Sequence, residues 1–150
     1  MQDYHQLQIW ERSIRYAVDL YRFSAGLPDA ERYNLVAQLR KAATSVPLNI
    51  AEGSGCSTDA EFVRFLGYAY RSLKEVVTCL ELCERLYSTV EHQPLTVLMD
   101  EGNQISRMTH VLMRRLSSAD DASAGVHLIN QIRDSKLKTQ HSRLTTDTVP

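Results

Sequence analysis

The chain has 150 residues, of which 43% are hydrophobic and 23% charged, and its formal net charge is −1. This composition is ordinary for one globular domain and excludes the strongly basic overall field typical of many nucleic-acid-binding proteins. The sequence holds no apolar run of about eighteen residues, which excludes a helical membrane span, and no secretory signal layout at its start. Its three cysteines cannot all pair with each other, so a cytoplasmic protein with free thiols is expected.

The first predicted helix covers residues 4–25 and carries two apolar stripes. Residues on one stripe recur at alternating steps of three and four, as one helix face requires. The first stripe is Leu7, Trp10, Ile14, Ala17 and Tyr21, and the second is Ile9, Tyr16, Leu20 and Phe23. Either both stripes form one wide core face, or one of them meets another subunit.

The second predicted helix follows a turn over residues 26–29, with Asp29 as its N-cap. Its predicted inner face consists of Leu35, Leu39, Ala42, Val46 and Ile50. Gly53 or Gly55 is expected to end this helix, because glycine is the residue most often found just beyond a helix C-terminus.

The third predicted helix begins at a capping box, Thr58 with Glu61. It carries the longest regular apolar stripe of the chain, a heptad pattern typical of antiparallel bundles. The stripe is Phe62, Leu66, Ala69, Leu73, Val76, Leu80, Cys83 and Tyr87. A short connection over residues 88–93 is expected to follow.

The fourth predicted helix starts at Pro94, which suits the first helical position. Its stripe is Leu95, Leu98, Gly102, Ile105, Thr109, Leu112 and Leu116. Four amphipathic segments with short turns predict an all-α fold, an antiparallel up-down-up-down four-helix bundle over residues 1–117. Residues 118–150 are predicted to be a linker, a short helix over 126–137 and a flexible tail.

The stretch over residues 40–55 breaks local helix rules. Pro47 removes a backbone donor and presses on the carbonyl of Ala43. We interpret Pro47, Asn49, Glu52 and Gly53 as architectural rather than catalytic. Asn49 is expected to satisfy a carbonyl released at the proline, and Glu52 to pair with an arginine or to cap the third helix.

The sequence offers no constellation for catalysis or for metal binding. Cys79 and Cys83 are one helical turn apart, but Cys83 falls on the core stripe and no ligand pair accompanies them. The five histidines are scattered, and P-loop, GxGxxG and GxSxG motifs are absent. We therefore expect no enzyme, no metal and no cofactor.

Several basic residues share helix faces and are candidates for phosphate contacts. The alternative is an ordinary solvated surface, since acidic residues balance the basic ones along the chain. The candidate nucleic-acid contacts are Arg12, Arg15, Arg40, Lys41, Arg64, Arg71 and Lys74.

The central stretch resembles the signature of a bacterial four-helix-bundle family. Residues 38–53 read QLRKAATSVPLNIAEG, against an approximate family pattern QLRRAAxSIPSNIAEG. That family includes proteins encoded in 23S rRNA intervening sequences and the accessory variability determinant of diversity-generating retroelements. The likeness spans residues 4–117, and it departs at Cys56, where arginine is common, and at Arg71, where glycine is common.

The resemblance implies a homopentameric ring without known catalysis. Its retroelement branch implies binding of RNA and of a reverse transcriptase through a basic surface. We therefore expect a noncatalytic homo-oligomer that serves as a scaffold or accessory protein and binds RNA, a reverse transcriptase or both. The alternative is an adaptor bundle that binds a partner protein and no nucleic acid.

Overall fold

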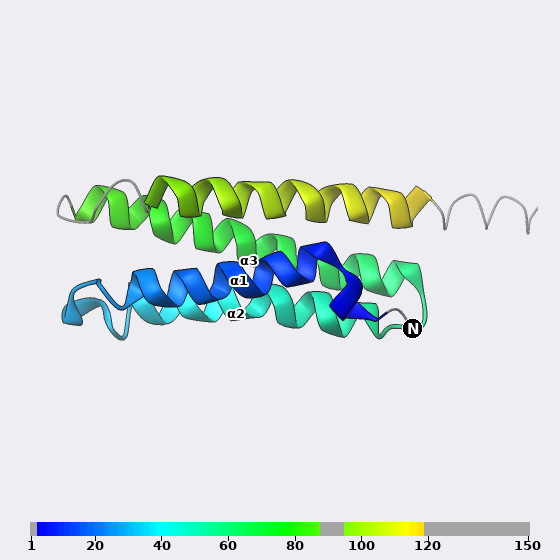
Figure 1. Ribbon diagram of the computed structural model, residues 1–150, viewed down its shortest axis with the longest axis horizontal. Helices are drawn as coiled ribbons and strands as arrows, with labels where there is room; N and C mark the ends of the chain where they lie inside the picture. The colour runs from blue at the N-terminus through cyan, green and yellow to red at the C-terminus, as the bar shows by residue number, and fades with distance from the viewer. Residues whose placement is uncertain (1–2, 88–94, 119–150) are drawn as a thin grey trace, which may run out of the picture.

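The computed structural model describes residues 3–87 and 95–118, and this part of the chain is helical, without a strand. The long helices are α1 (Gln8–Ser24), α2 (Leu35–Ser54), α3 (Asp59–Leu86) and a fourth helix over residues 95–118. Two 3₁₀ turns, η1 (Tyr4–Gln6) and η2 (Asp29–Glu31), precede α1 and α2. Successive helices run in opposite directions (Figure 1), which confirms the predicted antiparallel four-helix bundle.

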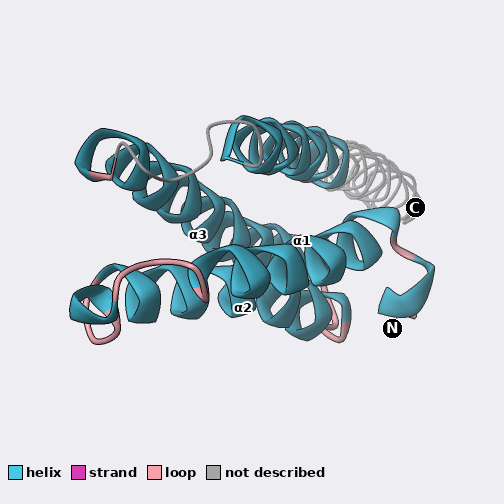
Figure 2. Cartoon of the chain, turned by 60° about the vertical axis from the view of Figure 1, so that its left-hand side comes forward, coloured by secondary structure: helices cyan, strands magenta, loops and turns pink. Residues whose placement is uncertain are grey.

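Helix α2 packs against both α1 and α3, with the larger contact to α3, and the fourth helix lies on the same side of α1 and α2 as α3 does (Figure 2). The predicted stripe of α3 supplies the centre of the core between them: Leu66, Ala69, Leu73, Val76, Leu80 and Cys83 are all fully buried. The predicted inner face of α2 is buried throughout, as are Leu95, Leu98, Ile105 and Thr109 on the fourth helix. Heptad spacing thus identified the core faces of these three helices.

Helix α1 buries most of its second apolar stripe and only part of its first, of which Ala17 is buried and Leu7 and Trp10 pack against the core. Ile9, Tyr16 and Leu20 are buried, whereas Ile14 is 36% and Tyr21 42% exposed. The small buried side chains of Ser13 and Ser24 complete the inner face. The core face of α1 therefore takes in the second stripe and part of the first, and Ile14 and Tyr21 of the first stripe lie on the surface.

The predicted N-cap of the second helix is wrong. Asp29 begins the short turn η2, and α2 starts six residues later, at Leu35. Glu31 bonds the start of α2 instead: its carboxylate accepts a hydrogen bond from the Leu35 N–H, the first amide of the helix, at 3.2 Å. Tyr87 also donates its hydroxyl to Glu31, which ties η2 to the end of α3 and lowers the pKa of Glu31.

The turn between α2 and α3 follows its predicted chemistry. Helix α2 ends at Ser54, with Gly55 as the C-cap. Thr58 caps α3 and accepts a hydrogen bond from the Glu61 N–H at 3.2 Å. The fourth helix continues to residue 118, the last one described and one predicted to belong to the linker, whereas the predicted connection over 88–93, Pro94 and the segment from 119 onward lie outside the described residues.

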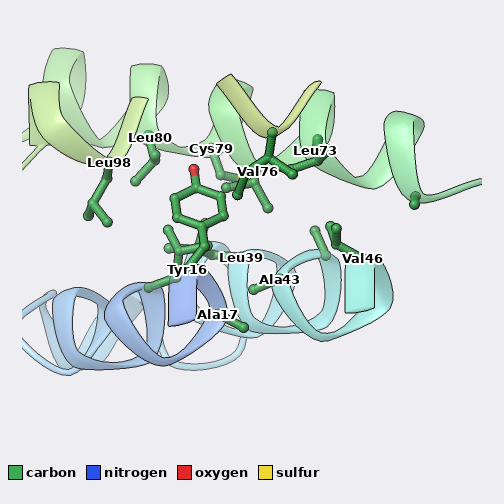
Figure 3. Close-up of a cluster of buried hydrophobic side chains, with 14 of the residues drawn as sticks. Tyr16, Ala17, Leu39, Ala43, Val46, Leu73, Val76, Cys79, Leu80 and Leu98 are labelled. Carbon is green, nitrogen blue, oxygen red and sulfur yellow. The ribbon is translucent and has the colours of Figure 1, made fainter. Parts of the chain in front are cut away.

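Tyr16 stands in the centre of the core between α1 and α3 (Figure 3). Its side chain is 2% exposed, and its hydroxyl has no hydrogen-bond partner among residues 3–87 and 95–118. Burial raises the pKa of this phenol. The hydroxyl lies against Gly102 of the fourth helix, where an added Cβ would come within 2.5 Å of it.

Candidate assembly and nucleic-acid surfaces

The signature residues lie on the last turns of α2, where it packs against α3. Pro47 is buried and α2 continues through it. Asn49 does not reach the Ala43 carbonyl that the proline leaves without its usual donor. Its amide donates instead to the carbonyl of Ser45 at 2.7 Å and to the Ser45 hydroxyl at 3.0 Å. Ser72 of α3 donates to the same hydroxyl at 3.0 Å, so Asn49 helps to hold a polar link between the two helices.

Gly53 and Glu52 differ sharply in their surroundings. An added Cβ on Gly53 would lie 2.7 Å from both the Phe62 ring and the Phe65 Cβ, so only glycine lets α2 and α3 approach this closely. Glu52 is exposed, and among the described residues its carboxylate has neither the predicted arginine partner nor a contact that caps α3. Glu52 is therefore an exposed carboxylate without the structural contact predicted for it.

An apolar groove opens on the surface between α1 and α2. Its volume is about 640 Å³. We call it the α1–α2 groove. Its lining residues are Ile14, Ala17, Val18, Tyr21, Arg22, Thr44, Pro47 and Leu48. Val18 is 45% exposed and Leu48 66%, which leaves a contiguous apolar patch of the kind that marks interaction sites.

Three candidate contact residues on α1 and α2 are engaged within the chain. Arg12 forms a two-pronged ion pair with Glu101, at 2.8 and 2.5 Å, which ties α1 to the fourth helix and raises the pKa of the guanidinium. Arg15 pairs with Glu11 at 3.0 Å on the exposed side of α1. Arg40 donates its Nε to the Ser24 hydroxyl, whereas Lys41 is exposed and has no partner among the described residues.

The other candidates alternate with aromatic rings along α3. Arg64 lies 5.5 Å from the Phe65 ring and Arg71 4.9 Å from the Tyr68 ring. The two rings meet edge to face, with centroids 5.8 Å apart. We call Arg64, Phe65, Tyr68 and Arg71 the aromatic–basic strip.

A further cation–aromatic pair, Lys74 with Tyr70, lies on the side of α3 that faces the fourth helix. The Lys74 ammonium is 5.3 Å from the centre of the Tyr70 ring. The centres of the Tyr70 and His110 rings are 6.3 Å apart. Sequence reasoning found the cations and missed the aromatic partners. The signal was present in the i,i+3 and i,i+4 spacing of Tyr68 with Arg71 and of Tyr70 with Lys74.

The two cysteines of α3 pack in the core, as predicted. Cys79 is 5% exposed and Cys83 is fully buried. Burial raises the pKa of both thiols, that of Cys83 to about 11. In residues 3–87 and 95–118, no three metal-ligating side chains are grouped so that they could hold an ion, and no helix is long and apolar enough to cross a bilayer.

Comparisons with known proteins agree on family and fold. Residues 5–111 match the profile of the family described as 23S rRNA-intervening sequence protein. A similar solved structure is a protein of unknown function of the S23 ribosomal protein family from Bacteroides thetaiotaomicron, with a TM-score of 0.62 at 20% identity. That match covers 70% of this chain and 97% of the other. No curated protein is similar enough to count as a relative.

Proposed function

Since this chain belongs to the 23S rRNA-intervening sequence protein family, we propose that it is a noncatalytic bundle that assembles with copies of itself and binds single-stranded RNA. The α1–α2 groove supports self-assembly. It exposes apolar side chains from two helices, and covering them would remove this surface from water.

The occupant we propose for the groove is a second copy of the chain. On α3, Leu82 is 43% and Leu86 60% exposed, one helical turn apart and away from the groove residues. Two apolar side chains at this spacing suit insertion between α1 and α2 of a neighbour. Such a head-to-tail contact uses two different surfaces, and it closes into a ring when the rotation between copies allows.

Val18→Glu is expected to dissociate the assembly, because a carboxylate buried in an apolar contact has no partner to offset its lost hydration. Light scattering should give a multiple of the 17.1 kDa chain mass for the wild type, a pentamer if the family resemblance holds, and a single chain for the variant. Val111→Glu is the matched control, since Val111 is 49% exposed on the fourth helix outside the groove. A wild-type chain that is monomeric when concentrated would contradict the proposal.

The aromatic–basic strip supports the RNA part of the proposal. Proteins bind single strands by combining cations that track the backbone with rings on which bases stack. The strip supplies both over two turns of one helix, and Tyr68 is 40% exposed. The near-neutral charge of the whole chain is compatible with this role, because the strip is a local feature.

Tyr68→Ala is expected to weaken binding of a labelled poly(U) oligonucleotide by about 1–3 kcal/mol, the usual contribution of one stacked base.

Replacing Arg64 and Arg71 by Gln should reduce the slope of log affinity against log salt by about 1.4, since each phosphate contact to a single strand contributes about 0.7. Tyr33→Ala is the control, because Tyr33 is 90% exposed and lies outside the strip. Equal losses for both tyrosines, or no binding at low salt, would refute the RNA role.

A protein-binding adaptor without RNA is the competing function, and a reverse transcriptase is the protein partner that the retroelement resemblance implies. Pull-down from cells with and without nuclease separates the two. We expect protein partners to be lost on nuclease treatment if RNA bridges them. A protein partner that is retained after nuclease treatment, together with no RNA binding at the aromatic–basic strip, would favour the adaptor.

A further inference from the structure

We propose a second binding site, an oxyanion pocket for a phosphate group, between the end of α1 and the first half of α2. The pocket has a volume of about 330 Å³, and its lining includes Ser24, Pro28, Asp29, Arg32, Val36 and Arg40. It is separate from the aromatic–basic strip on α3 and goes beyond the function proposed above.

Two contacts fix the orientation of the Arg40 side chain, and neither of them uses its two terminal nitrogens. Its Nε donates to the Ser24 hydroxyl at 2.8 Å, and its guanidinium lies 4.9 Å from the centre of the Tyr21 ring. Ser24 is only 2% exposed and donates its own proton to the Tyr21 carbonyl at 3.0 Å, so its lone pair faces the arginine. A buried hydroxyl and a ring thus hold one guanidinium in place before any ligand arrives.

The terminal nitrogens of Arg40 have no partner among the described residues, and no described carboxylate lies within ion-pair distance of Arg40 or Arg32. Two terminal N–H groups in one plane match two oxygens of a phosphate, which is the geometry that arginine recognises best. Arg32, which is exposed at the mouth of the same pocket, adds a second positive charge.

Asp29 gives the pocket a feature that makes the proposal sharply testable. Asp29 lines the same cavity and, among the described residues, pairs with neither arginine, so its negative charge opposes an incoming anion. Phosphate binding should therefore respond in opposite directions to changes at Asp29 and at the arginines. A merely structural role for these residues would not produce that reversal.

Calorimetric titration of the full chain with inorganic phosphate tests the site. Arg40→Lys and Arg32→Gln are each expected to weaken binding by about tenfold or more, because charge-assisted hydrogen bonds are lost. Asp29→Asn should tighten binding by up to about fivefold, the scale of one exposed charge pair. Arg107→Gln is the control, since Arg107 is exposed on the fourth helix and belongs to neither this pocket, the α1–α2 groove nor the aromatic–basic strip.

Two further arms identify the source of the phosphate and keep the test independent of the function above. Oligoribonucleotides with and without a 5′-phosphate are compared with adenosine monophosphate, and a preference for either phosphate form names the source. Tyr68→Ala should retain phosphate binding, which separates this pocket from the strip. Absent phosphate binding, or Arg32→Gln binding phosphate like the wild type while its unfolding midpoint is unchanged, would overturn the proposal.

Discussion

Gly53→Ala is expected to lower the free energy of unfolding by about 2 kcal/mol, although alanine is normally the better helix residue. Alanine in place of glycine inside a helix usually stabilises by about 0.5–1 kcal/mol. Here the new Cβ would lie 2.7 Å from the Phe65 Cβ, which cannot swing aside because it is fixed to the backbone of α3. The two helices must therefore separate, and overpacking of this kind costs about 1–3 kcal/mol, occasionally more.

Gly55→Ala is the matched control for this prediction. Gly55 also follows helical dihedral angles, with φ −82° and ψ −9°, but an added Cβ would meet only the Glu52 carbonyl at 3.4 Å. Urea denaturation should give this variant a midpoint equal to or slightly above that of the wild type. If Gly53→Ala were as stable as Gly55→Ala, the close approach of α2 and α3 would not be a constraint on the fold.

Gly102→Ala is expected to destabilise the bundle by about 2–3 kcal/mol, because three helices meet at this glycine. The added Cβ would lie 2.5 Å from the Tyr16 hydroxyl of α1 and 3.0 Å from Cγ2 of Val77 on α3. Tyr16 is 2% exposed, so turning its ring away would displace closely packed neighbours.

Tyr16→Phe should rescue most of the loss at Gly102. The change removes the clashing oxygen, and the next ring atom of Tyr16 is 3.2 Å from the added Cβ. On its own, Tyr16→Phe should leave stability unchanged or raise it by about 1 kcal/mol, because no described residue forms a hydrogen bond with the hydroxyl. A double-mutant cycle measures the coupling. Additive losses would show that the hydroxyl is not the obstacle.

The fold could be predicted because its information is local. The heptad stripe of α3, the capping threonine and the glycines at the end of α2 each specify a structure over a few residues, and all agree. The two stripes of α1 could not be ranked, since both are apolar and periodicity does not say which one faces inward. The start of α2 was missed because Glu31, four residues upstream, supplies the hydrogen bond that a local N-cap rule assigns to the adjacent residue.

The candidate surfaces were predictable only in part, because they depend on pairs that are distant in sequence. Arg12 looks like a free surface cation until the fold brings it against Glu101, which is 89 positions away. The α1–α2 groove likewise brings residues of α1 next to Pro47 and Leu48 of α2. No local sequence pattern predicts that these residues lie together. The aromatic–basic strip lies within one helix and could have been found from spacing alone.

The burial of two cysteines makes the third one useful as a chemical handle. A thiol reagent reacts with the thiolate, and burial keeps Cys79 and Cys83 protonated and covered at neutral pH. Cys56 is half-buried at the turn between α2 and α3. The unaltered sequence therefore offers one attachment point per chain for a fluorophore or spin label, from which the spacing of copies in an assembly can be measured without engineering a site.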